Sequence, residues 1–357
     1  MTAVDWSMAD QATRLIDWRT ASTIGAKLSG NGVPLSDVQR ARLIEDFSEL
    51  VPQAEAHVVE FTQLQPNGYR ARPWVMTRSE WIDANLRGFQ RVLEPLARRV
   101  LERAGNGRTA AGFRRKALGL QVGALMGYVS RKVLGQYDLF LPPDDDGLLY
   151  FVGPNVASVE RRFRFPQRDF RLWLSLHEVA HRVQFGSVPW LRGYLTGQVD
   201  VYLSAMEVDP KRILEAVKRA VEEFRNKGSA AAQNLIFLLM TPEQRAVLER
   251  VQAMMSLLEG HANFVMNRVG DGRVAEAARM RRSLQERRQS SGVERTFQRM
   301  IGFDSKIRQY DTGERFVSEV VDTAGMEAFN RVWDSADNLP SMAEVMKPAD
   351  WLARVVS

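Results

Sequence analysis

Two histidines, His177 and His181, lie four residues apart in the sequence, and Glu178 directly follows the first of them. The apolar pattern around them predicts a helix that runs from Asp169, its N-cap, to about Phe185. Residues four apart share one helix face at roughly 6 Å from each other, so both imidazoles could bind one Zn²⁺. Glu178 would take a proton from water on that metal and later pass it to the leaving group. The spacing therefore predicts the metal-binding and catalytic core of a zinc hydrolase.

The alternative is a chance match on an exposed helix. The composition of the segment argues against it, because a largely apolar helix is buried, and buried histidines need polar partners or a metal. The apolar residues around the histidines are Phe170, Trp173, Leu174, Leu176, Val179, Ala180 and Val183.

A catalytic zinc site needs a third protein ligand and an open fourth position. The two neighbouring candidates are Glu259 and His261, which would point about 200° away from each other on a helix. Glu259 is preferred as the third ligand, because its helix face carries smaller and more polar residues. Its face holds Met255, Ser256, Ala262 and Asn263, and the face of His261 holds Leu257, Leu258, Phe264 and Val265.

Two further roles follow from this helix. Asn263, one turn after Glu259, is a candidate for orienting a ligating histidine through a hydrogen bond. His261 has two alternative roles, either as a catalytic donor to the oxyanion that develops during hydrolysis or as a core histidine with satisfied hydrogen bonds.

The rest of the chain predicts a predominantly helical α+β fold with one small sheet near the middle. Turn signals at 104–107 suggest an N-terminal helical region over residues 1–105 and a catalytic domain over 106–357. Expected strands are Leu148–Val152, the clearest in the sequence, and a shorter one at Arg161–Phe165. Expected helical segments, besides that of the motif, are 12–28, 38–50, 81–101, 117–129, 210–269 with breaks at 228–229 and 241–242, 274–289, 313–333 and 343–356.

One apolar stretch, 117–129, carries Gly119, Gly123 and Gly127 at four-residue spacing. Such spacing occurs in membrane helices, but this stretch is shorter than the roughly 20 residues needed to cross a bilayer. We expect a buried helix whose glycines allow close backbone contact, and no membrane partner.

Composition excludes several classes of protein. The chain has no cysteine, so thiolate metal sites, cysteine nucleophiles and disulfides are excluded. The formal net charge is +6, but the arginines are scattered without interleaved aromatic residues, so no nucleic-acid partner is expected. The N-terminus lacks the pattern of a secretory signal, which favours a cytoplasmic location.

The chain resembles the zincin-like metallopeptidases of the glutamate-ligand (gluzincin) type. It is more closely similar to a bacterial family of hydrolases labelled as associated with biosynthesis of the deazaflavin coenzyme F420. The segments that carry the resemblance are Leu134–Asp138, Phe151–Asn155, the His177 motif, Glu259–His261 and Lys306–Trp333.

The resemblance implies that His177, His181 and Glu259 bind zinc and that Glu178 is the catalytic base. It also implies a zincin core in which an edge strand beside the active-site helix binds an extended substrate, a role that Leu148–Val152 would fit. Glu259 lies much further from the motif than in thermolysin-like relatives. A helical insertion around residues 205–250 would account for the difference.

The leading functional hypothesis is hydrolysis of a peptide or protein substrate by a zinc-activated water. The alternative is a catalytically silent zinc-binding scaffold, against which Glu178 argues, because structural zinc sites prefer four protein ligands. The aromatic residues Trp190, Tyr194 and Tyr202 would line a substrate pocket or belong to the core. The oligomeric state is not predicted.

Overall fold

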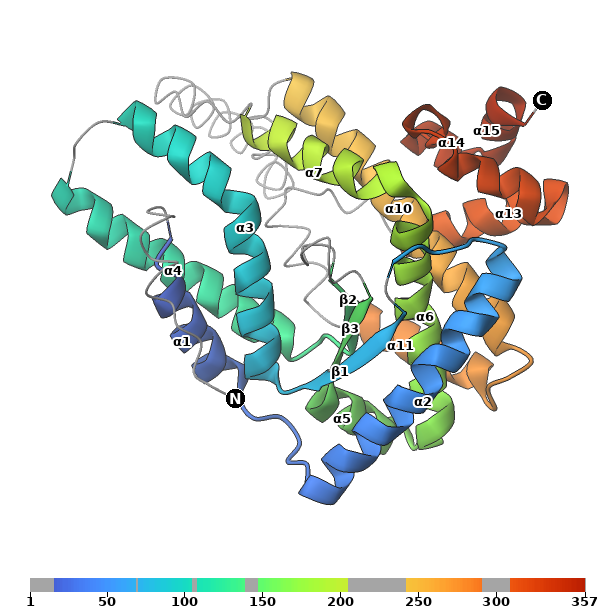
Figure 1. The fold of residues 1–357 in the computed structure, drawn as a ribbon, viewed down its shortest axis with the longest axis horizontal. Coiled ribbons are helices and arrows are strands. Elements are labelled where there is room, and N and C mark those ends of the chain that lie inside the picture. The colour runs from blue at the N-terminus through green and yellow to red at the C-terminus, as the bar shows by residue number, and fades with distance from the viewer. Residues whose placement is uncertain are drawn as a thin grey trace, which may run out of the picture. The chain divides into compact units, whose positions relative to one another are not determined.

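The computed structural model describes residues 16–68, 70–104, 108–138, 147–204, 242–290 and 309–356 (Figure 1). Its strands are β1 (Arg72–Met76), β2 (Gly135–Tyr137) and β3 (Leu148–Val152). Its α-helices are α1 (Trp18–Ser29), α2 (Asp37–Thr62), α3 (Arg78–Ala104), α4 (Arg108–Ser130), α5 (Gly153–Phe163), α6 (Gln167–Ser187), α7 (Pro189–Ser204), α10 (Pro242–Gly270), α11 (Ala277–Ser290), α13 (Gln309–Asn330), α14 (Met342–Met346) and α15 (Pro348–Val355). Two short 3₁₀ turns are η4 (Arg331–Trp333) and η5 (Ala336–Asn338).

The chain forms two compact units. The first comprises Met1–Val58, Asn67–Gly186 and Arg273–Ala275, and the second comprises Val59–Pro66, Ser187–Gly272 and Glu276–Ser357. The expected boundary at residue 105 lies outside the described residues, as does most of the expected insertion at 205–250. The predicted predominantly helical α+β fold with a small sheet is confirmed.

The sheet belongs to the first unit and has the strand order β1-β3-β2. β1 pairs with β3 in parallel, and β2 pairs with β3 antiparallel. The strand predicted at Leu148–Val152 is confirmed as β3, but the expectation that it lies at an edge is wrong, because it has a partner on each side. Among the described residues the edges of the sheet are β1 and β2, and neither was predicted, because β1 contains Pro73 and β2 has three residues.

The two faces of this sheet pack on different helices. On one face, Tyr150 and Val152 share a buried core cluster with Trp81 of α3. On the other, the ring of Tyr137 stacks on that of Phe185 in α6, with 5.7 Å between the ring centroids. β2 is therefore held directly against the helix that carries the histidine motif.

The second predicted strand, at Arg161–Phe165, is wrong. These residues instead complete α5 and the turn after it, in which Arg164 adopts a left-handed conformation with φ 51°. The backbone N–H of Arg164 donates to the carbonyl of Glu160 and ends the helix. The two-residue spacing of Phe163 and Phe165 suggested a strand. It instead reflects their positions on either side of the end of α5, where their rings stack with 5.4 Å between the centroids.

The expected close packing of the glycine-rich helix is confirmed. A Cβ atom at Gly119 would lie 2.5 Å from the carbonyl oxygen of Asp17, and one at Gly123 would lie 2.5 Å from that of Ala21. α4 and α1 therefore meet backbone to backbone. Among the described residues, no helix has both the length and the apolar character needed to span a bilayer.

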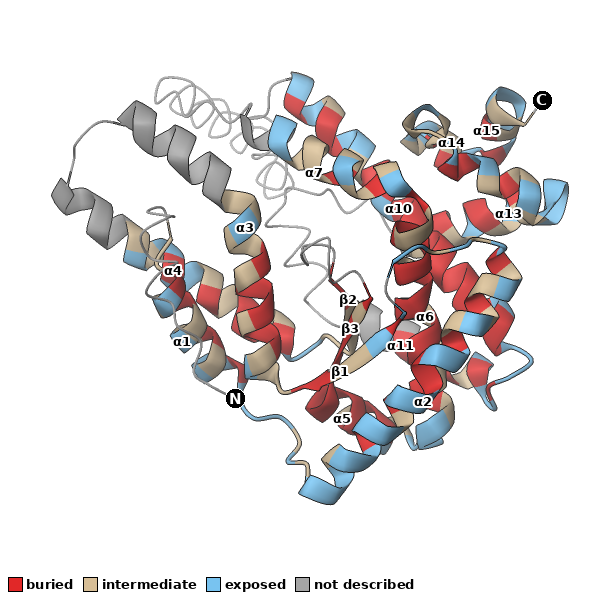
Figure 2. Cartoon of the chain, viewed as in Figure 1, coloured by how far each residue is buried: buried red, intermediate tan, exposed pale blue. Residues whose placement is uncertain are grey.

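In the second unit, α10 packs closely on α13. A Cβ atom at Gly260 would meet the backbone of Gly313 at 2.2 Å, so neither glycine can carry a side chain without separating the helices. The middle of α10 is buried along most of its length (Figure 2). This packing fixes how the residues next to Gly260 face, including Glu259 and His261.

Candidate metal centre

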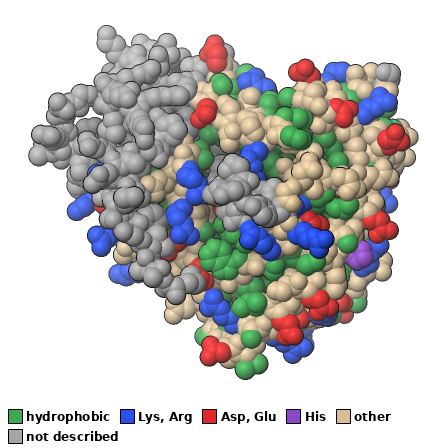
Figure 3. Space-filling model, in the orientation of Figure 1, with side chains coloured by type: hydrophobic (Ala, Val, Ile, Leu, Met, Phe, Trp, Pro, Cys, Tyr) green, Lys and Arg blue, Asp and Glu red, His purple; other side chains and the backbone are tan. Residues whose placement is uncertain are grey.

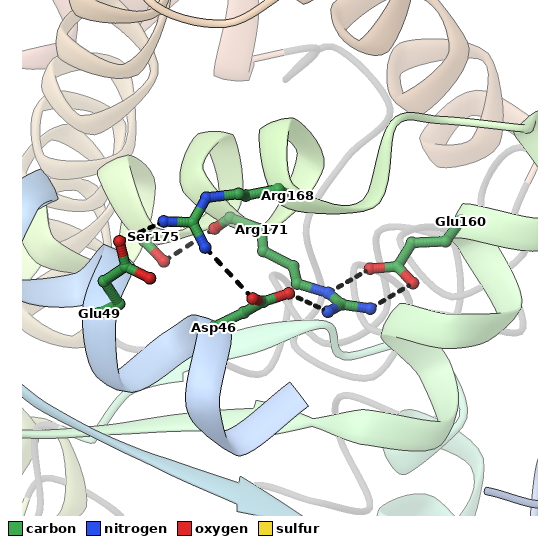
Figure 4. Close-up of polar contacts among 6 residues, drawn as sticks. All are labelled: Asp46, Glu49, Glu160, Arg168, Arg171 and Ser175. Atoms are coloured by element: carbon green, nitrogen blue, oxygen red, sulfur yellow. Dashed lines mark hydrogen bonds and ion pairs between the residues drawn. The ribbon is translucent and has the colours of Figure 1, made fainter. Parts of the chain in front are cut away.

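The motif helix, α6, is anchored two turns before His177 by a buried ion pair. The guanidinium of Arg171 donates to both oxygens of Glu160, at 2.8 and 3.0 Å, and also to Asp46 of α2 (Figure 4). Burial raises the pKa of Glu160, while the hydrogen bond and charge of Arg171 oppose the rise. Because a buried charge that loses its partner is costly, this pair holds α6 against α2 and α5.

The helix is observed over Gln167–Ser187, two residues longer at each end than predicted. Asp169 therefore lies in the first turn and is not the N-cap. Its carboxylate instead accepts a hydrogen bond from the backbone N–H of Ala275 at 3.1 Å.

His177 and His181 project from one face of α6, as the spacing predicts. Their ring centroids are 4.9 Å apart and the ring planes are almost perpendicular, at 88°. Both side chains are half-buried, whereas most of their neighbours on the helix are buried. The two imidazoles are therefore close enough to bind one metal ion and exposed enough to be reached from solvent.

His181 has a hydrogen-bond partner on its own helix that was not predicted. Its Nδ1 lies 3.0 Å from Oε1 of Gln184, whose side chain is fully buried. The signal was present in the sequence, because residues three apart on a helix are neighbours.

Glu178 is buried, with 6% of its surface exposed, and its carboxylate faces β2. Oε2 accepts a hydrogen bond from the backbone N–H of Tyr137 at 3.0 Å. A Cβ atom at Gly135 would lie 2.6 Å from Oε1, so the carboxylate occupies the space that a side chain there would fill. Strand β2 thus positions the predicted base through its backbone.

Glu259 lies on α10 and is half-buried among largely buried neighbours. The potential ligand atoms of His177, His181 and Glu259 all lie within 4.8 Å of one another. Three atoms that each bind one tetrahedral zinc at about 2.0–2.2 Å lie closer to one another than this. Small adjustments of the side chains would bring the three atoms to such distances. Two imidazoles and one carboxylate are also donors that zinc accepts, and the set therefore fits the metal.

His261, the other predicted site residue on α10, lies in an aromatic cluster of the second unit. Its side chain is fully buried, its ring stacks on that of Phe329 at 5.3 Å, and its edge meets Trp333 at 5.6 Å. This packing places His261 in the core of the second unit. Asn263 is also buried.

The aromatic residues after the motif helix were expected to line a pocket or to belong to the core. The indole N–H of Trp190 donates to the carbonyl of Trp333 at 2.9 Å, and its ring meets that of Tyr194 edge to face. Both contacts lie within the second unit and support the core alternative. The side chain of Tyr202 lies outside the described residues.

Comparisons with known proteins agree with the motif. A profile of the zincin-like metallopeptidases matches residues 16–352. A crystal structure from Chloroflexus aurantiacus, described as a presumed hydrolase with a novel fold, is 32% identical with a TM-score of 0.70. The match covers 95% of this chain and 98% of that one. No match was found among curated proteins. On the extent of the family match, the chain belongs to the zincin-like metallopeptidase family.

Proposed function

We propose that this protein is a zinc-dependent metallopeptidase whose ligands are His177, His181 and Glu259. The observation that carries the proposal is the grouping of these three donors within 4.8 Å, two of them on the helix that also carries the buried Glu178. Three protein ligands next to a carboxylate are typical of catalytic zinc sites, whereas structural sites prefer four ligands. This difference also argues against a catalytically silent zinc-binding scaffold.

In this proposal Glu178 is the general base. When bound, zinc would lower the pKa of a water molecule and polarise the carbonyl of the substrate. Glu178 accepts the proton of the attacking water and then donates it to the leaving amine. The N–H of Tyr137 holds Oε2, so the carboxylate keeps one orientation during both transfers.

The proposed substrate is an extended peptide or protein segment. Of the two true edges of the sheet, β2 is the one that contacts Glu178, so we propose that β2, rather than β3, pairs with the substrate. The backbone of the substrate would then lie beside the base.

Two further expectations remain predictions. Figure 3 shows Lys and Arg side chains spread among acidic, apolar and other side chains on the described part of that face, and the expectation of no nucleic-acid partner stays a prediction. A cytoplasmic location stays a prediction. The link to coenzyme F420 is no part of this proposal, because none of the described residues suggests deazaflavin chemistry.

The proposal is tested with a library of quenched fluorescent peptides. We expect cleavage that is lost with a zinc chelator, restored by zinc and absent from Glu178→Gln, which keeps the volume of the side chain but cannot accept the proton. Glu286→Gln, an exposed substitution on α11, is the matched control and should cleave normally. Cleavage by Glu178→Gln at the rate of the wild type would contradict the assigned role.

A further inference from the structure

We propose that Gln184 is a positioning residue that keeps the proton of His181 on Nδ1, so that Nε2 is the nitrogen presented to the metal. The binding of a metal by His181 rests on the proposed function. The position of the proton does not, because it is a property of the metal-free chain.

A hydrogen bond joins the side chains of Gln184 and His181. Oε1 of Gln184 lies 3.0 Å from Nδ1 of His181, within the range of a good hydrogen bond. An amide oxygen can only accept, so with the amide of Gln184 in this orientation Nδ1 carries the hydrogen. In a neutral imidazole the other nitrogen then has a lone pair, which is the form that binds a metal.

The burial of Gln184 makes this orientation persistent. Its side chain is fully buried between Val183 and Phe185, which are buried as well. An amide placed in such a position costs free energy unless it is hydrogen-bonded, so its retention in an apolar stretch needs a polar partner. His181 is a partner from the same helix, three residues earlier, so the geometry of α6 itself brings the two side chains together.

Turning the amide of Gln184 around would move the proton of His181 to the other ring nitrogen. If the NH₂ group of Gln184 faced Nδ1, the histidine would accept there and carry its proton on Nε2. Metal binding through Nε2 would then require the proton to move and the hydrogen bond to break. Hydrogen-bond partners of this kind alter metal affinity by roughly 10- to 100-fold when they are removed.

The tautomer can be measured directly by ¹⁵N NMR of the histidine rings in the metal-free protein. We expect His181 of the wild type to be protonated on Nδ1 in its neutral form. Gln184→Glu keeps an acceptor of the same shape and should preserve this tautomer, whereas Gln184→Leu should shift the population toward protonation on Nε2. A wild type already protonated on Nε2, or an unchanged tautomer in Gln184→Leu, would overturn the proposal.

Zinc affinity gives a second measurement, made by competition with a chromophoric chelator. Gln184→Leu should bind zinc 10- to 100-fold more weakly than the wild type, and Gln184→Glu should recover most of the affinity. The control is Ser175→Ala, which removes another buried hydrogen bond of α6, from Ser175 to the carbonyl of Arg171. It should bind zinc as the wild type does. Equal affinities of Gln184→Leu and the wild type would contradict the positioning role.

The two measurements separate the possible failures. A wild type that binds no zinc would contradict the proposed function, and the tautomer would still test the role of Gln184. If Gln184→Leu does not fold, the wild-type tautomer still decides, with Gln184→Glu as the second variant.

Discussion

The backbone N–H of Tyr137 donates to Oε2 of Glu178 across 3.0 Å, although the two residues are 41 positions apart in the chain. The bond joins an edge strand to the motif helix and orients the carboxylate predicted to act as the base. Since the donor is a backbone group, this orientation depends on the path of β2 more than on the identity of a side chain.

Gly135→Ala should impair turnover without removing zinc. The added Cβ would lie 2.6 Å from Oε1 of Glu178, so either the carboxylate or β2 must move. We expect kcat to fall by about ten-fold or more, because a misplaced base transfers protons poorly, while the zinc content stays normal. The control is Gly193→Ala, whose Cβ would meet no atom within 4 Å. A Gly135→Ala enzyme with unchanged kcat would show that the close approach of β2 has no catalytic role.

Arg171→Met should destabilise the first unit strongly, because it leaves the carboxylate of Glu160 buried without its main partner. Loss of one member of a buried pair costs about 3–5 kcal/mol, measured as a shift in the urea midpoint. The control is Arg168→Met, which removes the ion pairs of a half-exposed guanidinium with Glu49 and Asp46 and should leave the midpoint nearly unchanged. Equal effects of the two substitutions would contradict the anchoring role of Arg171.

The loss in Arg171→Met should also depend on pH. Burial already raises the pKa of Glu160, and removing Arg171 raises it further. A group with a raised pKa in the folded state stabilises the fold when protonated, and this contribution disappears as the pH rises through that pKa. The deficit of Arg171→Met relative to the wild type should therefore shrink as the pH falls from neutral toward the pKa of unfolded glutamate. A deficit that grows on acidification would contradict this account.

His261→Phe should bind zinc normally and keep turnover within a few-fold of the wild type. Phenylalanine preserves the stacking on Phe329 and the contact with Trp333, and it removes only the ring nitrogens. Steady-state kinetics on a confirmed substrate provide the measurement. A fall in kcat of about 100-fold or more, with zinc retained, would instead support the catalytic alternative, donation to the oxyanion.

The sequence predicted the parts of the site that depend on helical periodicity. His177, Glu178 and His181 could be placed on one helix from their spacing alone. The spacing of the glycines in α4 likewise predicted a close helix contact. The approach of β2 could not be predicted, because a three-residue strand leaves almost no alternation to detect. The central position of β3 likewise could not be predicted, because it depends on β1, and a strand that contains a proline such as Pro73 is hard to recognise from sequence. Gln184 could have been found, since it lies one helical turn after His181.

The most direct test of the account is the zinc content of the purified protein compared with that of its ligand variants. We expect about one equivalent of zinc per chain in the wild type and loss of that zinc in His177→Ala, His181→Ala and Glu259→Ala. His261→Ala, which removes the other histidine of α10, should keep its zinc wherever it folds. Near-normal zinc in His177→Ala and His181→Ala would contradict the metal site itself. Loss of zinc from His261→Ala but not from Glu259→Ala would show that the third ligand is His261 and not Glu259.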